Sequence, residues 1–386
     1  MAQNQRPFVL DRRLLLGSGL ALLASPAVAR RQGVIEAPIE VGDHRVTIAA
    51  HLNGRGPYRF VIDTGAQLSG VSSGLARELG LRAARTVRLN GRQFDVYAID
   101  ELLLGGVVRQ AEAAFFGLDD ARTLGGEGLL AAGMVTTVDS ELLHGEGLWR
   151  LHPSGLATMD GYDLVAARLD RARVSGLSAR PHGPVRVRDT EIDAVWDTGG
   201  PHALSLPSGL AGRLGLTGPD TPFAPIPGAS IRGRATVPAR MIAAPPIRVG
   251  NETFDGGRIV IRMDDSLSDA VILGFPVLRG LDLAIAGRGQ RFGIRRNALG
   301  PVNLPYGFSG LWLDDVRGRL TVSVVGTRSP AADAGLLEGD VITNLGDMSS
   351  AIRALRGPDG TSVTVTFVRN GETQSATIRL RDYLAA

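Results

Sequence analysis

Two aspartates in the sequence, Asp63 and Asp197, are each followed by threonine and then glycine, and they lie 134 positions apart. Two carboxyl groups held about 3 Å apart cannot both ionise, so such a pair shares one proton over the working pH range. One carboxylate can then take a proton from a water molecule while the other acid donates a hydrogen bond to a carbonyl oxygen. If the fold brings the two aspartates together, the expected chemistry is acid–base activation of water, and the titration belongs to the pair.

A single Asp-Thr-Gly sequence is weak support for such a site, because aspartate commonly begins a turn. The residues around the two motifs, however, are also repeated in order. The matched blocks are Phe60–Ala66 with Ala194–Gly200, Ser73–Leu81 with Ser208–Leu216, and Leu129–Ala131 with Ile272–Gly274. Ordered blocks that recur in register indicate a duplicated chain rather than two unrelated turns. Buried, paired aspartates are also unfavourable unless they serve a purpose.

Each copy contains the elements that would place its aspartate just after a β-hairpin. In the first copy, strand-like runs occur at Val46–Ile48 and Tyr58–Ile62, with a turn-rich segment between them. In the second copy, the corresponding runs are Val185–Arg188 and Ile192–Trp196. A short helix is expected after each motif, and each of these helices is followed by a glycine, Gly80 or Gly215.

With these motifs the chain resembles the pepsin and retropepsin clan of aspartic peptidases, in particular bacterial retropepsin-like proteins with two such lobes and a PDZ domain. The resemblance implies a mainly β fold of two pseudo-symmetric acid-protease-type β-barrel lobes, at 34–155 and 156–299. It implies that Asp63 and Asp197 are the catalytic pair, and that water attacks a peptide bond of a protein or peptide substrate without a covalent enzyme intermediate. The matching residues are Ile62–Ala66, Val195–Gly199 and Ile272–Gly274.

The resemblance also assigns supporting roles to the residues beside the aspartates. Thr64 and Thr198 are expected to hydrogen-bond across the pseudo-twofold axis and hold the lobes together. Gly65 and Gly199 let the backbone turn tightly, where a Cβ would obstruct either a strained φ or the approach of the other lobe. These four residues complete the expected site.

Substrate is expected to lie extended in the cleft between the lobes and to pair with nearby strands. Two strand-like segments with a glycine-containing turn, 87–97 and 226–235, are candidates to cover it. Two positions depart from the family pattern. Ala131 stands where the first lobe should carry the glycine that Gly274 supplies, and Gly200 replaces the usual alanine or serine after Asp-Thr-Gly. The main alternative is therefore a catalytically inactive relative that binds peptides.

The last part of the chain, 306–386, follows a short linker and resembles a bacterial PDZ domain, a small α/β fold. The resemblance rests on the blocks Tyr306–Leu313, Ser329–Leu336 and Glu338–Ile342. Such domains add a peptide as an extra strand and hold its C-terminal carboxylate on backbone amides. The amides implied here are those of Ser309, Gly310 and Leu311. A docking or packing role is the alternative, because a PDZ fold need not capture free C-termini. A structural adaptor that uses this module alone is a third reading.

The first 29 residues have the order of an export signal. Arg12 and Arg13 precede the apolar run Leu14–Ala24, and the small residues Ala27–Ala29 provide a cleavage site. The pattern predicts a periplasmic or secreted protein cleaved after Ala29. The paired arginines are also typical of twin-arginine export; an ordinary signal with two chance arginines is the alternative. Membrane attachment is expected only if the signal stays uncleaved, and the run is shorter than the roughly 20 apolar residues of a spanning helix.

Composition excludes several other classes of function. The chain has 42 basic residues, all arginine, and 39 acidic ones. Without residues 1–29 the counts are 39 and 38, and so balanced a charge argues against a nucleic-acid partner. The absence of cysteine excludes disulfides and thiolate metal sites. The six histidines lack metal-ligand spacing, so neither a metal nor another cofactor is expected. Among them, only His202 lies close to a motif, five residues after Asp197.

Overall fold

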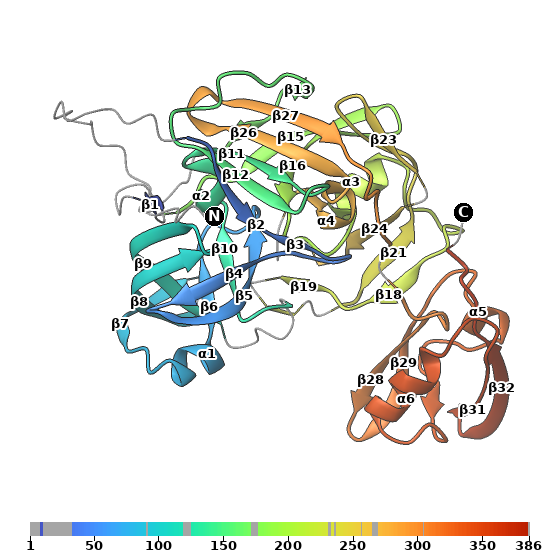
Figure 1. Cartoon of the computed structure of the whole chain (residues 1–386). Coiled ribbons are helices and arrows are strands. Elements are labelled where there is room, and N and C mark those ends of the chain that lie inside the picture. The colour runs from blue at the N-terminus through green and yellow to red at the C-terminus, as the bar shows by residue number, and fades with distance from the viewer. Residues whose placement is uncertain are drawn as a thin grey trace.

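The computed structural model describes residues 8–10, 33–89, 92–118, 125–170, 177–230, 233–234, 237–255, 257–264, 269–303 and 305–384. The protein is mainly β, as predicted, and a separate module at the C-terminus packs beside the larger β body (Figure 1). The expected export signal at 1–29 lies outside the described residues except for strand β1 (Phe8–Leu10), which pairs with Val108–Gln110. In the part of the chain that the structure describes, no helix is both long and apolar enough to span a membrane.

The first copy forms a closed barrel of six strands. Its order is β9-β6-β10-β5-β4-β8, and pairing between β8 and β9 closes the ring. Strand β7 extends the ring as a hairpin with β8, and the short strand β3 (Glu40–Val41) pairs with β4. The strands are β4 (Val46–Leu52), β5 (Arg55–Asp63), β6 (Gly70–Ser72), β7 (Ala83–Leu89), β8 (Arg92–Leu104), β9 (Val108–Leu118) and β10 (Gly128–Ala131).

The second copy pairs its strands in the same order, but two of them are broken. The counterpart of β9 is divided into β23 and β24. Where β8 runs unbroken in the first copy, two shorter strands, β21 and β22, are separated by Pro245 and Pro246. Proline lacks the N–H that a sheet ladder needs, which explains the break. The strands are β14 (Arg168–Leu169), β15 (Pro181–Val187), β16 (Thr190–Asp197), β17 (Leu204–Pro207), β18 (Ala224–Ile226), β21 (Ala239–Ala243), β22 (Ile247–Val249), β23 (Glu252–Phe254), β24 (Arg258–Arg262) and β25 (Ile272–Gly274).

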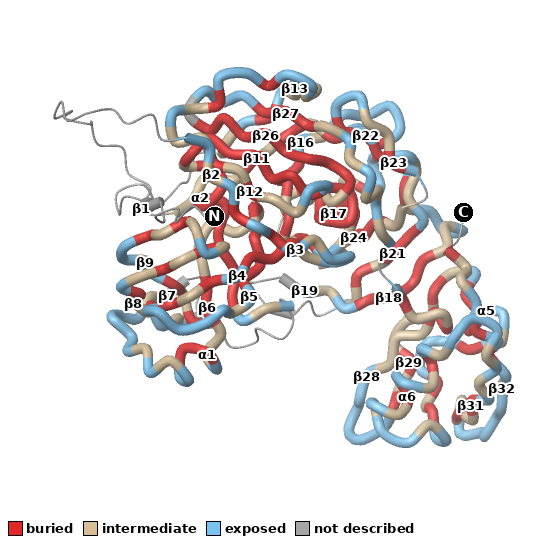
Figure 2. The backbone as a smooth tube through the Cα atoms, in the orientation of Figure 1, coloured by how far each residue is buried: buried red, intermediate tan, exposed pale blue. Residues whose placement is uncertain are grey.

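A third sheet contains strands from both copies. Its order is β13-β27-β26-β11-β12-β2, and β11 of the first copy pairs directly with β26 of the second. The buried apolar core likewise runs through both halves, which Figure 2 shows as continuous red segments. The two copies therefore share one body. The strands are β2 (Ile35–Pro38), β11 (Asp139–Leu143), β12 (Leu148–His152), β13 (Asp163–Val165), β26 (Leu281–Ala286) and β27 (Arg291–Arg296).

Short helices follow the repeated motifs. Helices α1 (Ser73–Glu78) and α3 (Ser208–Arg213) confirm the prediction, and Gly80 and Gly215 after them adopt positive φ angles of 67° and 65°. A left-handed residue at this position is a common way to end a helix, and glycine adopts it without steric penalty. Each copy then ends its later block in one more helical turn, α2 (Gly133–Thr136) or α4 (Phe275–Leu278).

The C-terminal module has its own apolar core and a sheet of five strands in the order β28-β29-β30-β31-β32. Two helices complete it, α5 (Pro330–Asp333) and α6 (Met348–Leu355). Strands β31 and β32 form a closing hairpin around Asn370 and Gly371, turn residues that favour such a connection. The strands are β28 (Leu311–Val316), β29 (Arg319–Val325), β30 (Val341–Ile342), β31 (Ser362–Arg369) and β32 (Glu372–Arg379).

Candidate active site

The two aspartates stand at equivalent ends of equivalent strands. Asp63 is the last residue of β5 and Asp197 is the last residue of β16. Beside β5, the parallel strand β10 places Ala131 opposite Asp63. Beside β16, the parallel strand β25 places Gly274 opposite Asp197. The repeated sequence blocks are thus paired with each other inside each copy, and both strand ends lie where the copies meet.

The threonines after the aspartates join the two copies by reciprocal hydrogen bonds. The Thr64 amide donates to the Thr198 hydroxyl oxygen at 3.1 Å, and the Thr198 amide donates to the Thr64 hydroxyl oxygen at 2.9 Å. Each hydroxyl then donates across the boundary, from Thr64 to the Trp196 carbonyl and from Thr198 to the Ile62 carbonyl, both at 2.5 Å. Both threonines are fully buried. Each copy thereby fixes the backbone next to the other copy's aspartate.

The glycines that follow show how closely the aspartates approach. A Cβ placed on Gly65 would lie 2.2 Å from the Cγ atom of Asp197, and one placed on Gly199 would lie 2.3 Å from the Cγ atom of Asp63. Neither glycine has a φ in the left-handed region. Of the two reasons that the sequence suggested for these glycines, it is the close approach that applies: each carboxyl group packs directly on the glycine of the opposite copy.

Backbone amides hold each carboxyl group in place. Asp63 Oδ1 accepts hydrogen bonds from the amides of Gly65 and Ala66 at 3.0 and 2.8 Å, and Asp197 Oδ1 accepts one from Gly199 at 2.8 Å. Burial raises the pKa of both aspartates, and the nearby Asp197 charge raises the pKa of Asp63 further, well above its usual range. At Asp197, burial is opposed by a hydrogen bond from Asp63 and by backbone amides. The pair as a whole therefore holds a proton more tightly than an ordinary aspartate does.

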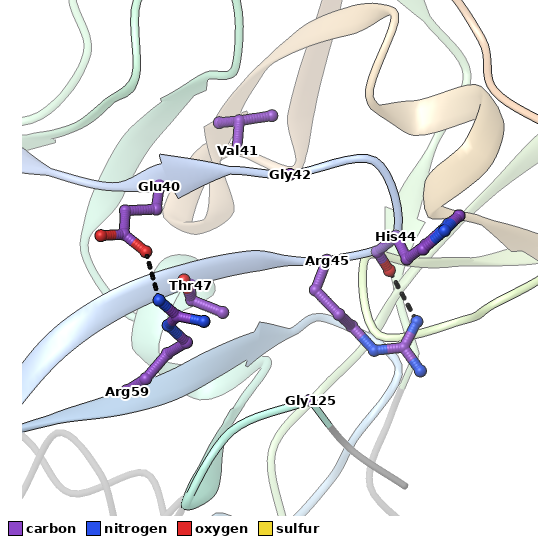
Figure 3. Close-up of a pocket in the computed structure, with 8 residues that line it drawn as sticks. All are labelled: Glu40, Val41, Gly42, His44, Arg45, Thr47, Arg59 and Gly125. Carbon is purple, nitrogen blue, oxygen red and sulfur yellow. Dashed lines mark hydrogen bonds and ion pairs between the residues drawn. The ribbon is translucent and has the colours of Figure 1, made fainter.

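Sequence reasoning missed one charged neighbour of the pair. Arg45, at the turn between β3 and β4, lies close enough to both aspartates for its charge to favour their ionised forms. Its guanidinium donates to the His44 carbonyl at 2.7 Å, and its stem lies beside Gly125 (Figure 3). In a chain whose 42 basic residues are all arginine, no sequence pattern distinguishes this one.

Arg45 also lines a hollow of about 330 Å³ that contains neither aspartate. In Figure 3, Arg59 in the same hollow pairs with Glu40, at an N–O distance of 3.3 Å. Arg45 therefore connects this hollow with the acid pair. Its lining residues are Glu40, Val41, Gly42, His44, Arg45, Thr47, Arg59 and Gly125.

His202 lies near the same arginine. Burial, together with the nearby Arg45 charge, lowers the pKa of His202 to about 4. The imidazole is therefore neutral at neutral pH and brings no charge to the pair. Its backbone matters more directly, because a Cβ on Gly274 would lie only 2.0 Å from the His202 carbonyl oxygen. This contact explains why the second copy carries glycine at 274.

The two departures from the family pattern leave the pairing around the aspartates intact. The Ala132 amide donates to the Ala66 carbonyl at 3.0 Å, as the Phe275 amide donates to the Gly200 carbonyl at 2.9 Å in the second copy. The Ala131 amide donates to the Ser69 hydroxyl oxygen at 3.0 Å. Gly200 supplies a backbone hydrogen bond to the Asp197 carboxyl group.

In the C-terminal module, two of the three amides expected to hold a carboxylate have partners inside the module. The Leu311 amide donates to the Ser309 hydroxyl oxygen at 3.3 Å, and the Gly310 amide donates to the Gly307 carbonyl at 3.4 Å. Among the described strands, β28 pairs only with β29, and it lies beside helix α6. One edge of β28 is therefore available for strand addition next to this loop.

The acid pair predicts an unusual pH dependence of stability. Its raised pKa means that folded Asp63 holds its proton more tightly than the unfolded chain does. As the pH rises, the unfolded chain ionises first, so the folded state loses stability until its own raised pKa is reached. Asp63→Asn removes this loss, so we expect its free energy of unfolding to exceed the wild-type value near pH 7 and to converge with it below about pH 3. Urea unfolding at a series of pH values measures the difference; a gap that is constant with pH would contradict the assignment.

Comparison with protein families agrees with this geometry. A family model described as aspartyl protease matches residues 48–132, which include Asp63 and its barrel strands. A second model, described as PDZ domain, matches residues 321–369 in the C-terminal module. A search of curated proteins gave no significant match. The two models recover the architecture that the sequence motifs suggested, an aspartyl-protease domain followed by a PDZ domain.

Proposed function

We propose that the protein is an aspartic endopeptidase in which Asp63 and Asp197 together activate a water molecule. The observation that carries this proposal is the mutual packing of each carboxyl group on the glycine of the opposite copy. The aspartyl-protease match over the first copy supports a general protease function. Asp197 lies outside the matched residues, so its part in the proposal is supported by its position against Gly65 of the first copy.

In this mechanism the pair begins with one shared proton, and the reaction proceeds from the state with that proton on Asp63. The Asp197 carboxylate takes a proton from the water, whose oxygen attacks the carbonyl carbon of the scissile bond. Asp63 meanwhile donates its proton to the carbonyl oxygen, which gives a neutral tetrahedral intermediate. A proton then passes from the pair to the amide nitrogen, the C–N bond breaks, and a hydroxyl group of the intermediate returns a proton to the pair. The products are a carboxylic acid and an amine, and the pair again holds one proton. Arg45 favours the ionised form of Asp197 and so helps keep it available as a base.

The substrate of this reaction is a protein or peptide, and the PDZ domain offers a second place for peptide binding. We further propose export to the periplasm or the exterior on the basis of the sequence pattern at 1–29, with twin-arginine export as one route. The PDZ domain is the observation that favours the rival proposal, a protein that binds peptides without cleaving them.

A peptide carrying a non-cleavable hydroxyl-bearing isostere of the tetrahedral intermediate is expected to inhibit the protein, because such a group binds as the transition state does. Residues 30–386 are incubated with denatured protein substrates across a pH series, with and without the isostere. We expect cleavage with a bell-shaped pH profile, since the reaction needs one acid and one base. A metal chelator should leave the rate unchanged. Activity that is lost on chelation and restored by zinc would contradict the mechanism, and peptide binding without cleavage at any pH would favour the rival.

A further inference from the structure

The C-terminal module packs against the second copy through an apolar docking surface. Figure 1 shows the module beside strands β18, β21 and β24. Aromatic rings from the module's two ends form much of the contact, with the Tyr306 ring 5.5 Å from the Tyr383 ring. The docking surface consists of Ala224, Ile226, Ala239, Met241 and Val260 from the second copy, and of Tyr306, Phe308, Tyr383 and Leu384 from the module.

Directional contacts fix the module at this surface. The Tyr383 hydroxyl donates to the Phe223 carbonyl at 3.0 Å, and Arg258 pairs with Asp382 at 2.5 Å. The backbones also approach closely, because a Cβ on Gly326 would lie 2.2 Å from the Phe223 carbonyl oxygen. Contacts of this kind hold one relative position, whereas a flexible tether would leave the module free to move.

The strands under the docking surface lead into the hairpin that corresponds to β7–β8 of the first copy. Strands β18 and β21 pair with each other at only three positions, and the chain between them contains the small hairpin of β19 (Ala229–Ser230) and β20 (Gly233–Arg234). This region is the second of the two segments expected to cover the cleft. The ribbon of β19 and β20 is only marginally stable alone, so its position depends on the hairpin base, where β21 also pairs with β24 and the docking surface packs on both strands.

The loop that precedes β28 contacts two of the residues at this docking surface, Tyr383 and Gly326. Gly310 has a φ of 75°, and a Cβ there would lie 2.9 Å from the Tyr383 hydroxyl oxygen. The Gly310 carbonyl also accepts a hydrogen bond from the Gly326 amide at 2.8 Å. The start of β28 is thus linked to Phe223, next to β18, through both the Tyr383 side chain and the Gly326 backbone, and β28 itself lies beside β18.

We propose that the docked PDZ domain holds the base of this hairpin, strands β18 and β21, in position, so that peptide binding along β28 and substrate binding in the cleft between the copies are energetically coupled. Coupling requires an element that can adopt two arrangements. Here that element is the base of the hairpin, which is either packed on Tyr306 and Tyr383 or released from them. Coupling of this kind is reciprocal: whatever stabilises docking stabilises the hairpin, and an occupied cleft stabilises docking. Only the part that concerns substrate rests on the proposed peptidase function.

Hydrogen exchange of the full chain tests the hold on the hairpin without any ligand. Tyr383→Phe removes one hydroxyl group and its bond to the Phe223 carbonyl, and we expect the amides of 224–226 and 239–243 to exchange about fivefold faster. The amides of β31 and β32, inside the module, should keep their wild-type rates. Tyr58→Phe is the matched control, because the Tyr58 hydroxyl bonds Glu78 on the exposed side of the first copy.

A charge reversal gives a stronger perturbation. Asp382→Arg places a second guanidinium group against Arg258 and should release the module, with a larger radius of gyration in small-angle scattering. Asp333→Arg, at an exposed pair with Arg381 in the same module, is the control. Wild-type exchange in both hairpin strands after release would overturn the proposal, and so would an unchanged radius, because the docking surface would then not be what positions the module.

A third measurement separates this coupling from the peptidase function. The isostere peptide is added to the wild-type protein, and exchange is followed at 306–311 and 382–384. We expect these amides to slow by a factor of about two to five if the cleft binds the peptide. If the isostere does not bind at all, the peptidase proposal fails while the variant experiments still decide the coupling. Binding without any change at these amides would overturn the coupling to substrate.

Discussion

Asp63→Asn and Asp197→Asn are each expected to lower kcat for peptide hydrolysis by about 10³-fold or more, because loss of a positioned acid or base removes a contribution of this order. Asparagine keeps the size of the side chain. Its amide oxygen can still accept the hydrogen bond that the Gly65 amide donates to Asp63 and that the Gly199 amide donates to Asp197. It can neither hold the shared proton nor accept one from water. Initial rates on a quenched-fluorescence peptide, measured with residues 30–386, give the comparison.

Asp193→Asn is the matched control for this experiment. Asp193 lies on β16, four residues before Asp197, but its side chain is exposed and pairs with Arg168 at 2.9 Å. Its replacement should leave kcat within about twofold, because surface ion pairs contribute little. Equal activity in the wild type and in both site variants would eliminate the proposed enzyme. Loss of activity together with loss of folding would be recognised by circular dichroism, whereas we expect Asp63→Asn to fold at least as stably as the wild type near pH 7.

Gly65→Ala and Gly199→Ala are expected to lower activity by about 10²-fold or more while all acids remain in place. The new methyl group would lie 2.2 to 2.3 Å from the opposite carboxyl carbon, so that carboxyl group must move. A displacement of about 1 Å at reacting groups is enough for an effect of this size. Overpacking at the boundary should also lower the free energy of unfolding by about 1–3 kcal/mol. Rates and urea midpoints measured together test both effects.

Gly74→Ala is the matched control, and we expect it to lower neither the activity nor the free energy of unfolding. Gly74 lies in helix α1, and a Cβ there would have no neighbour closer than the Ser72 hydroxyl oxygen at 3.9 Å. Alanine in a helix interior is favoured over glycine by about 1 kcal/mol, so this variant should be slightly more stable and equally active. If Gly65→Ala behaved like Gly74→Ala, the close approach of the two aspartates would be wrong.

The repeat made the local features of the fold predictable. Strands before each aspartate, the helices that end at Gly80 and Gly215, and the closing hairpin of the C-terminal module all follow from hydrophobic patterning and turn residues within short segments. The family resemblance added the positions of Thr64 and Thr198. These features depend on neighbours in the sequence or on a motif whose two copies can be compared.

Features that depend on distant packing were not predictable. The sheet shared by both copies requires β11 to meet β26, and no local signal in either strand specifies that partner. Arg45 approaches the aspartates only through the placement of the β3–β4 turn. The break between β21 and β22 follows from Pro245 and Pro246 once the matching strand β8 is known. The docking of the module depends on the shape of a surface that exists only after folding.

The sheet that both copies share has a consequence for the time at which the protein acquires activity. Strand β26, at 281–286, must pair with β11, at 139–143, before the boundary between the copies is complete. Contacts so distant along the chain form late in folding. A nascent chain that has emerged only as far as Asp197 therefore contains both acids but no assembled pair. The pairing of β11 with β26 therefore sets the earliest point in synthesis at which the acid pair can assemble, and that point comes only after the second copy has emerged.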